Sequence, residues 1–165
     1  MIDVKRFHSF QAAKLFADES SLDLRTGDFF LEYQGGSWDV DQLEGVEALI
    51  GQKAPDRVGI LSLVASPTAD ATDATGPFVR PDWADRANRA ASAIGLPPLL
   101  ARPESEVLKA FPQLQASTPF GDGTRHCLYG DVGEFLIQGI VHSKEGLLRL
   151  ELRHLPTVTS NRHKR

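Results

Sequence analysis

The clearest alternation of apolar and polar residues lies near the C-terminus. The apolar positions are Leu148, Leu150 and Leu152, and the charged positions that alternate with them are Arg149, Glu151 and Arg153. Because successive side chains of a strand point to opposite faces, this alternation predicts a strand with one apolar face. A second apolar segment, 134–142, precedes it, and residues 143–146 suit a tight turn with a left-handed glycine. The pattern predicts a C-terminal β-hairpin.

The turn geometry also predicts the register of this hairpin. The expected pairs are Ile140 with Leu150, His142 with Leu148, and Gln138 with Leu152. In this register the leucines belong to the core. The other face then combines apolar residues of the first strand with the charged residues of the second, so we expect helices to cover it in part. The apolar residues in question are Phe135, Ile137 and Val141.

Other segments follow helical or strand patterns. The spacing predicts helices over Val4–Asp18, Asp39–Ile50, Asp82–Ile94 and Glu104–Phe111, and strands over Asp28–Gln34, Val58–Ala65 and Arg125–Gly130. Asp39 with Gln42 forms a capping box for the second helix, and Gly51 would end it. Val58–Ala65 is almost continuously apolar, which is typical of a central strand buried on both faces.

The order of these elements does not alternate regularly between strand and helix, which favours an α+β fold over a doubly wound sheet. We therefore expect one α+β domain over residues 1–156, with a mostly antiparallel sheet of 4–5 strands and 3–4 helices. Residues 66–81 have few bulky apolar side chains and are expected to form a mobile loop. Residues 157–165 are expected to be a basic tail.

Composition narrows the function classes. The chain of 165 residues has a net charge of −4, and without the three basic residues of its last four positions the charge is −7. An acidic body argues against nucleic acid as a partner and favours a basic protein. No segment has the length of a membrane span or the pattern of a secretory signal. The single cysteine excludes an internal disulfide, so a cytoplasmic location is expected.

The residues that could perform catalysis do not form a known motif. His126 and Cys127 are adjacent on a predicted strand, so their side chains should point to opposite faces and not pair. Asp122 and Asp131 suit turns. His142 and His154 should lie too far apart on the hairpin to share a metal ion. No catalytic residue, metal site or cofactor is therefore expected.

One segment is a candidate contact site. Arg80, Asp82 and Trp83 follow the expected mobile loop, and arginine and tryptophan are enriched at interface hot spots. The sequence favours a non-catalytic protein-interaction module, such as an immunity-type or chaperone-like partner of another bacterial protein. The alternatives are a small enzyme or small-molecule-binding protein with a cleft under the 66–81 loop, and a purely structural domain.

Overall fold

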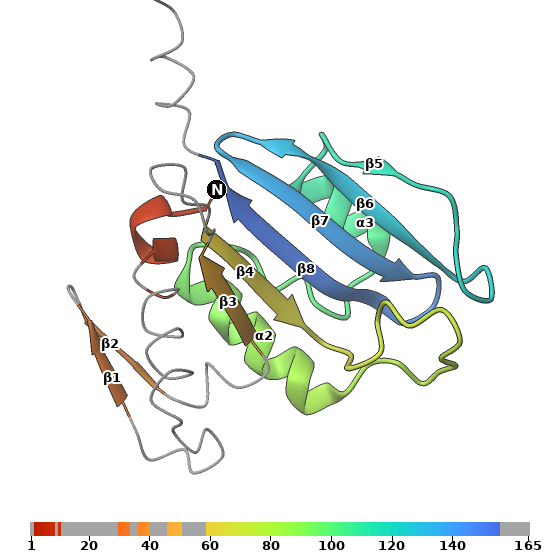
Figure 1. Ribbon diagram of the computed structural model, residues 1–165, viewed down its shortest axis with the longest axis horizontal. Coiled ribbons are helices and arrows are strands. Elements are labelled where there is room, and N and C mark those ends of the chain that lie inside the picture. Colours follow the sequence, from red (N-terminus) through yellow and green to blue (C-terminus); the bar gives the residue numbers. More distant parts are fainter. Residues whose placement is uncertain are drawn as a thin grey trace, which may run out of the picture.

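The chain folds around one antiparallel sheet. In the computed structural model the described residues are 2–8, 10, 30–33, 36–39, 46–50 and 59–155. The main sheet has the strand order β3-β4-β8-β7-β6-β5, and β1 and β2 form a separate pair (Figure 1). Its strands are β3 Val46–Ile50, β4 Gly59–Val64, β5 Gln115–Ala116, β6 Arg125–Val132, β7 Phe135–His142 and β8 Gly146–His154. The α+β class with an antiparallel sheet agrees with the sequence prediction.

Two helices pack on one face of this sheet. They are α2, Pro81–Ala93, and α3, Glu104–Ala110, and both lie behind the sheet in Figure 1. Small buried residues such as Ala87 and Ala90 let α2 approach the strands closely. The same core includes Leu61 and Leu150, and also Phe7 from a helical segment at residues 4–8. Burial of this apolar area is the main stabilising contribution to the fold.

The C-terminal hairpin forms as predicted, but its register differs. Ile140 lies opposite Arg149 and not Leu150, and His142 lies opposite Gly146. Gly146 has the expected left-handed backbone, with φ of 87°. The pairing is interrupted between Ile140 and Val141, because Leu148 is an extra residue on β8. This bulge was not predicted.

The corrected register changes which face each side chain occupies. Ile137 pairs with Leu152, and both are fully buried against the helices. Phe135, Ile137 and Val141 therefore share one face with Leu150 and Leu152. A slip of one residue exchanges the faces of a strand. The prediction that these three residues lie on the face opposite the leucines was therefore wrong, whereas the expected helix cover over them is present.

The predicted helix Asp39–Ile50 was also wrong. Asp39 ends strand β2, Gly36–Asp39, which pairs with β1, Phe30–Tyr33. Val46–Ile50 is strand β3 and pairs along its whole length with β4. The capping box and helical spacing are local signals, and pairing with a partner strand outweighs them. Residues 40–45, in the middle of the predicted helix, lie outside the described residues.

The remaining predicted elements agree with the structure where they are described. β4 confirms the buried strand at 58–65, and β6 extends the predicted strand at 125–130 to Val132. Asp82 does not cap α2, because Arg80 is the N-cap residue and Pro81 is the first helical residue. Of the predicted helix 4–18, residues 4–8 and 10 are helical and the rest are not described. The predicted tail also lies outside the described residues.

Candidate functional site

The face of the sheet opposite α2 and α3 is the candidate functional surface, and we call it the open face. No helix of the described part of the chain packs on it. The strand register brings side chains from β4, β6, β7 and β8 together there. These residues are Ser62, Cys127, Tyr129, Leu136, Gln138, Ile140, Arg149, Glu151 and Arg153. Of these, Tyr129 is 41% exposed, which is high for a large aromatic side chain.

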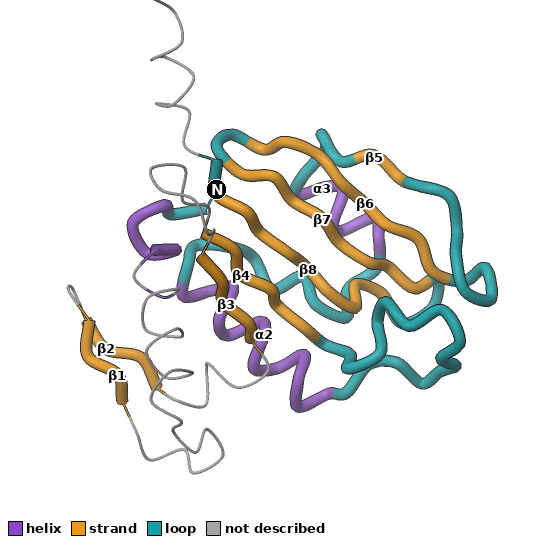
Figure 2. Tube along the Cα trace, viewed as in Figure 1, coloured by secondary structure: helices purple, strands orange, loops and turns teal. Residues whose placement is uncertain are grey.

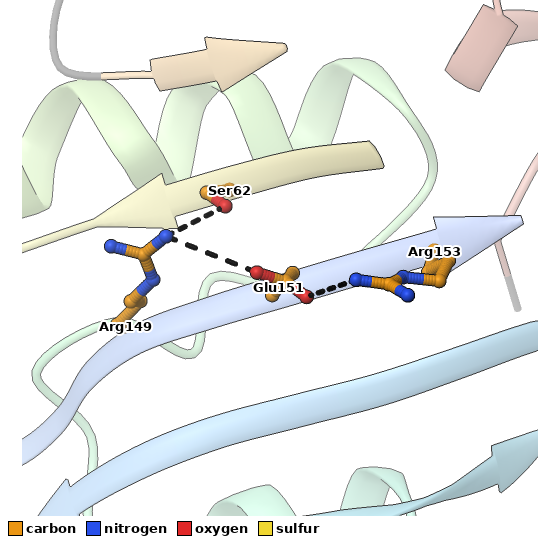
Figure 3. Close-up of polar contacts among 4 residues, drawn as sticks. All are labelled: Ser62, Arg149, Glu151 and Arg153. Atoms are coloured by element: carbon orange, nitrogen blue, oxygen red, sulfur yellow. Dashed lines mark hydrogen bonds and ion pairs between the residues drawn. The ribbon is translucent and has the colours of Figure 1, made fainter. Parts of the chain in front are cut away.

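Two arginines flank one carboxylate on the open face (Figure 3). Arg149 Nη2 lies 3.9 Å from Glu151 Oε1 and donates to Ser62 Oγ at 3.2 Å, and Arg153 Nη2 lies 3.5 Å from Glu151 Oε2. The three charged side chains are 27%, 22% and 40% exposed in the order 149, 151, 153. Ion pairs at this exposure contribute at most about 1 kcal/mol each. Their main effect is to place charge on this surface.

A small hollow lies beside these charges. Its volume is about 120 Å³, and it is lined by Cys127, Gln138, Gly139, Ile140, Arg149 and Glu151. None of the described residues that line the hollow with Cys127 is a histidine, and His126 is on the helix side with Nε2 2.8 Å from Glu104 Oε1. This agrees with the prediction that the adjacent histidine and cysteine do not pair.

Residues 66–80, which we call the strap, fold over one end of the open face (Figure 2). Phe78 is buried there and packs with Ala69 and with the extra residue Leu148. The Glu145 carboxylate accepts hydrogen bonds from the Phe78 amide at 2.9 Å and the Val79 amide at 2.8 Å. The strap therefore has defined contacts with the sheet, whereas its mobility stays a prediction.

Arg125 holds the other side of the strap. Its Nη1 donates to the carbonyl oxygens of Ala69 and Ala71, each at 2.8 Å. The guanidinium lies 4.5 Å from the centre of the Phe78 ring and 4.8 Å from that of Phe120. Such cation–π contacts are worth about 0.5–2 kcal/mol.

A chain of hydrogen bonds joins two histidines at the opposite end of the sheet. His154 Nε2 lies 3.0 Å from Glu134 Oε1, and His154 Nδ1 lies 2.8 Å from His8 Nε2. An ionised carboxylate can only accept, so His154 donates from Nε2. His142 pairs with Gly146 near the turn and is far along the ladder from His154, as predicted. In the described part of the chain, no group of three or more histidine, cysteine or acidic side chains could hold a metal ion.

The predicted contact residues lie at the start of α2 and not on the open face. Arg80 and Asp82 are exposed, and Trp83 is half-buried. The Asp82 carboxylate lies 3.5 Å from Arg86, and the Arg80 amide donates to Ala65. Sequence reasoning missed the open face because the shifted register placed its charged residues beside the wrong partners.

A larger hollow lies outside the sheet, along α2. It has a volume of about 470 Å³ and is lined by Asp85, Asn88, Arg89, Ser92, Ala93 and Pro98. Asn88 is committed to the fold, since its side chain bonds both the amide and the carbonyl of Leu100. None of the residues lining either hollow belongs to the 66–81 segment that was expected to roof a cleft.

Comparison with known proteins gives no relative: the chain matches no family model, no curated protein and no solved structure. Among the described residues, no helix is both long and apolar enough to span a membrane. Function must therefore be argued from the surface itself.

Proposed function

We propose that this protein is a non-catalytic protein-interaction module that binds its partner through the open face. The supporting observation is the combination of exposed Tyr129, the aliphatic Leu136 and Ile140, and an arginine–glutamate–arginine row on one sheet face without a described helix. Tyrosine and arginine are enriched at protein interfaces. An immunity-type or chaperone-like partner of another bacterial protein is the form of this proposal that the sequence already favours.

The size of the hollow favours a protein partner over a small molecule. Pockets for small ligands have volumes of about 300–1,000 Å³, whereas the hollow on the open face has about 120 Å³. A hollow of this size suits one inserted side chain. Ile140 in its wall is half-buried and apolar, so an aliphatic side chain is the complementary group.

The charges beside the hollow specify the rest of the contact. At the end of this row, the Arg153 side chain is 40% exposed, and its Nε has no hydrogen-bond partner among the described residues. We therefore infer that the partner places an acidic side chain next to the aliphatic one. The net negative charge of the whole chain favours a basic partner, because it attracts such a protein over a distance. The row of charges determines which side chains can be in contact with it once the two proteins have met.

Selection of linear peptides displayed on phage against the immobilised full-length protein tests this proposal. We expect enriched peptides that carry an aspartate or glutamate within two or three residues of a leucine, isoleucine or valine. Fluorescence polarisation with a selected peptide should show at least tenfold weaker binding to Ile140→Asp and to Arg153→Glu. Lys109→Glu makes the same charge change on exposed α3 and is the matched control, with unchanged affinity expected.

Two results would reject the proposal. One is enrichment of basic peptides, and the other is a selected peptide whose affinity is the same for the two open-face variants as for the wild type. Circular dichroism of each variant checks that the sheet is intact, so that a lost affinity is not caused by unfolding.

A small-molecule-binding function is the alternative, and the hollow along α2 is the observation that favours it. Its volume of about 470 Å³ is in the range of ligand sites, and Asp85 and Arg89 would supply charged contacts. A thermal-shift screen with a metabolite library should then find a compound whose stabilising effect is lost in Arg89→Ala. If the compound stabilises Arg89→Ala as much as the wild type, the hollow along α2 is not the binding site.

A further inference from the structure

Arg125 is a buried cation whose hydrogen-bonding capacity is only partly used. The side chain is 0% exposed. Its Nη1 donates to the carbonyl oxygens of Ala69 and Ala71 on the strap, with a longer contact of 3.4 Å to Thr68. Nε and Nη2 are also buried and have no hydrogen-bond partner in the described part of the chain. More than half of the N–H donors of this guanidinium are therefore unpaired.

Such a group requires a physical explanation. A buried donor without a partner costs about 1–3 kcal/mol, and a charged one costs more. Buried charges are normally paired with an opposite charge. No carboxylate of the described residues forms an ion pair with Arg125. Its carbonyl contacts and the rings of Phe78 and Phe120 offset the charge only in part.

The acidic side chain nearest in sequence is committed elsewhere. The Asp122 carboxylate accepts hydrogen bonds from the Thr124 hydroxyl and amide. These bonds, the hydroxyl first, hold the pKa of Asp122 below its usual value, and the charge of Arg125 contributes less. Asp122 is therefore an exposed turn residue that bonds its own turn and forms no ion pair with the guanidinium of Arg125.

The unpaired edge lies just below the surface. A Cβ atom added to Gly121 would lie 2.3 Å from Arg125 Nη2 and 3.3 Å from the carbonyl oxygen of Thr72. The contact between the strap and the 120–124 turn therefore closes over Nη2. Gly121 and Thr72 are themselves exposed. A small separation of strap and turn would open a path from solvent to Nε and Nη2.

We propose that the Nε–Nη2 edge of Arg125 is an oxyanion-binding site between the strap and the 120–124 turn. This edge presents two parallel N–H groups, which is the geometry that binds two oxygens of a phosphate, sulfate or carboxylate. The bound anion would neutralise the buried charge and join the strap to the turn. The anion could be free in solution or belong to a phosphorylated or acidic group of a partner.

Isothermal titration of the full-length wild-type protein tests the site directly. The probes are phosphate, sulfate and acetate, with chloride at equal ionic strength as the reference. We expect one anion per chain and a rise in Tm of about 5 °C or more at saturation. Preference for phosphate and sulfate would indicate a phosphoryl-type ligand, and preference for acetate a carboxylate. No binding of any of the three at millimolar concentration would overturn the proposal and leave Arg125 as a structural contact only.

Two glycine variants test whether the anion binds at the Nε–Nη2 edge of Arg125. Gly121→Ala places a methyl group against Nη2, whereas Gly123→Ala has no atom within 4 Å of its added Cβ. Both positions have positive φ, 67° and 88°, so both alanine variants carry backbone strain. We expect anion affinity to fall at least tenfold in Gly121→Ala and to persist in Gly123→Ala. Because sulfate and phosphate stabilise most folded proteins by exclusion, an equal response of both variants would place the anion effect elsewhere and reject the site.

Discussion

The observed register of the hairpin predicts where a cross-strand disulfide can form. In the structure Ile140 lies opposite Arg149, and adjacent Leu150 points to the other face. The variant Ile140→Cys/Arg149→Cys should therefore form a disulfide on oxidation, whereas Ile140→Cys/Leu150→Cys should not. Cys127 also lies opposite Ile140, so both double variants are made with Cys127→Ser.

The expected gain in stability follows from the loop that the bond closes. The bond closes a loop of ten residues, 140–149, and the chain-entropy model gives about 2.7 kcal/mol for a loop of that length. The variant loses the contacts of Arg149 to Ser62 and Glu151, at a cost of about 1 kcal/mol. The oxidised variant should therefore be about 1–2 kcal/mol more stable than the wild type, which raises Tm by about 2–8 °C. Its oxidised and reduced forms should differ by the full contribution of the bond, about 2.7 kcal/mol.

Three measurements check this prediction. Thiol titration and non-reducing electrophoresis report bond formation, and urea unfolding with and without reductant reports the stability. A disulfide in the Leu150 variant, with free thiols in the Arg149 variant, would refute the observed register. The assignment of Arg149 and Glu151 to the open face would then fail with it.

Three further predictions follow from single contacts. Glu145→Ala should cost about 2 kcal/mol and speed hydrogen exchange of the two strap amides that the carboxylate accepts from; unchanged exchange would contradict its role as an anchor. Asn88→Ala should cost about 2–3 kcal/mol in urea unfolding, because both backbone groups of Leu100 lose their partner, and a cost below 0.5 kcal/mol would show that water replaces it. Thr124→Val should raise the pKa of Asp122 toward its usual value in an NMR titration. Because that pKa is lowered in the folded state, the contribution of Asp122 to stability is present above its unfolded pKa and is lost as pH falls through the folded value; an unchanged midpoint in the variant would reject this cause.

Some elements could be predicted because their signals are local. The apolar run at 58–65 has the length of a strand and little polar character, and it forms β4. The alanine-rich stripe before Gly95 forms α2, and prolines on both sides bound α3. In each case the pattern of the segment and its packing in the fold agree, which is the condition under which a sequence pattern is reliable.

The segment 39–50 shows where local signals fail. Its aspartate, glutamine and apolar spacing all match a helix, yet Val46–Ile50 pairs with β4. The decisive interaction is with a strand that begins nine residues later, at Gly59. Hydrogen bonds to a neighbouring strand depend on which strands meet, and no local window contains that information.

The bulge at Leu148 explains both the error in the sequence prediction and the form of the candidate site. Leu147 packs with the helices, whereas Leu148 packs with Phe78 and Ala69 under the strap. Without the extra residue, the strict alternation from Leu148 to Leu152 would put all three leucines on one face, as the sequence suggested. With the extra residue, β8 supplies Leu150 and Leu152 to the core, and Leu148 is an apolar contact for the strap on the open face. Leu148 packs against Phe78, and the Phe78 ring lies beside the guanidinium of Arg125. The position of the proposed anion site therefore depends on a single inserted residue in β8.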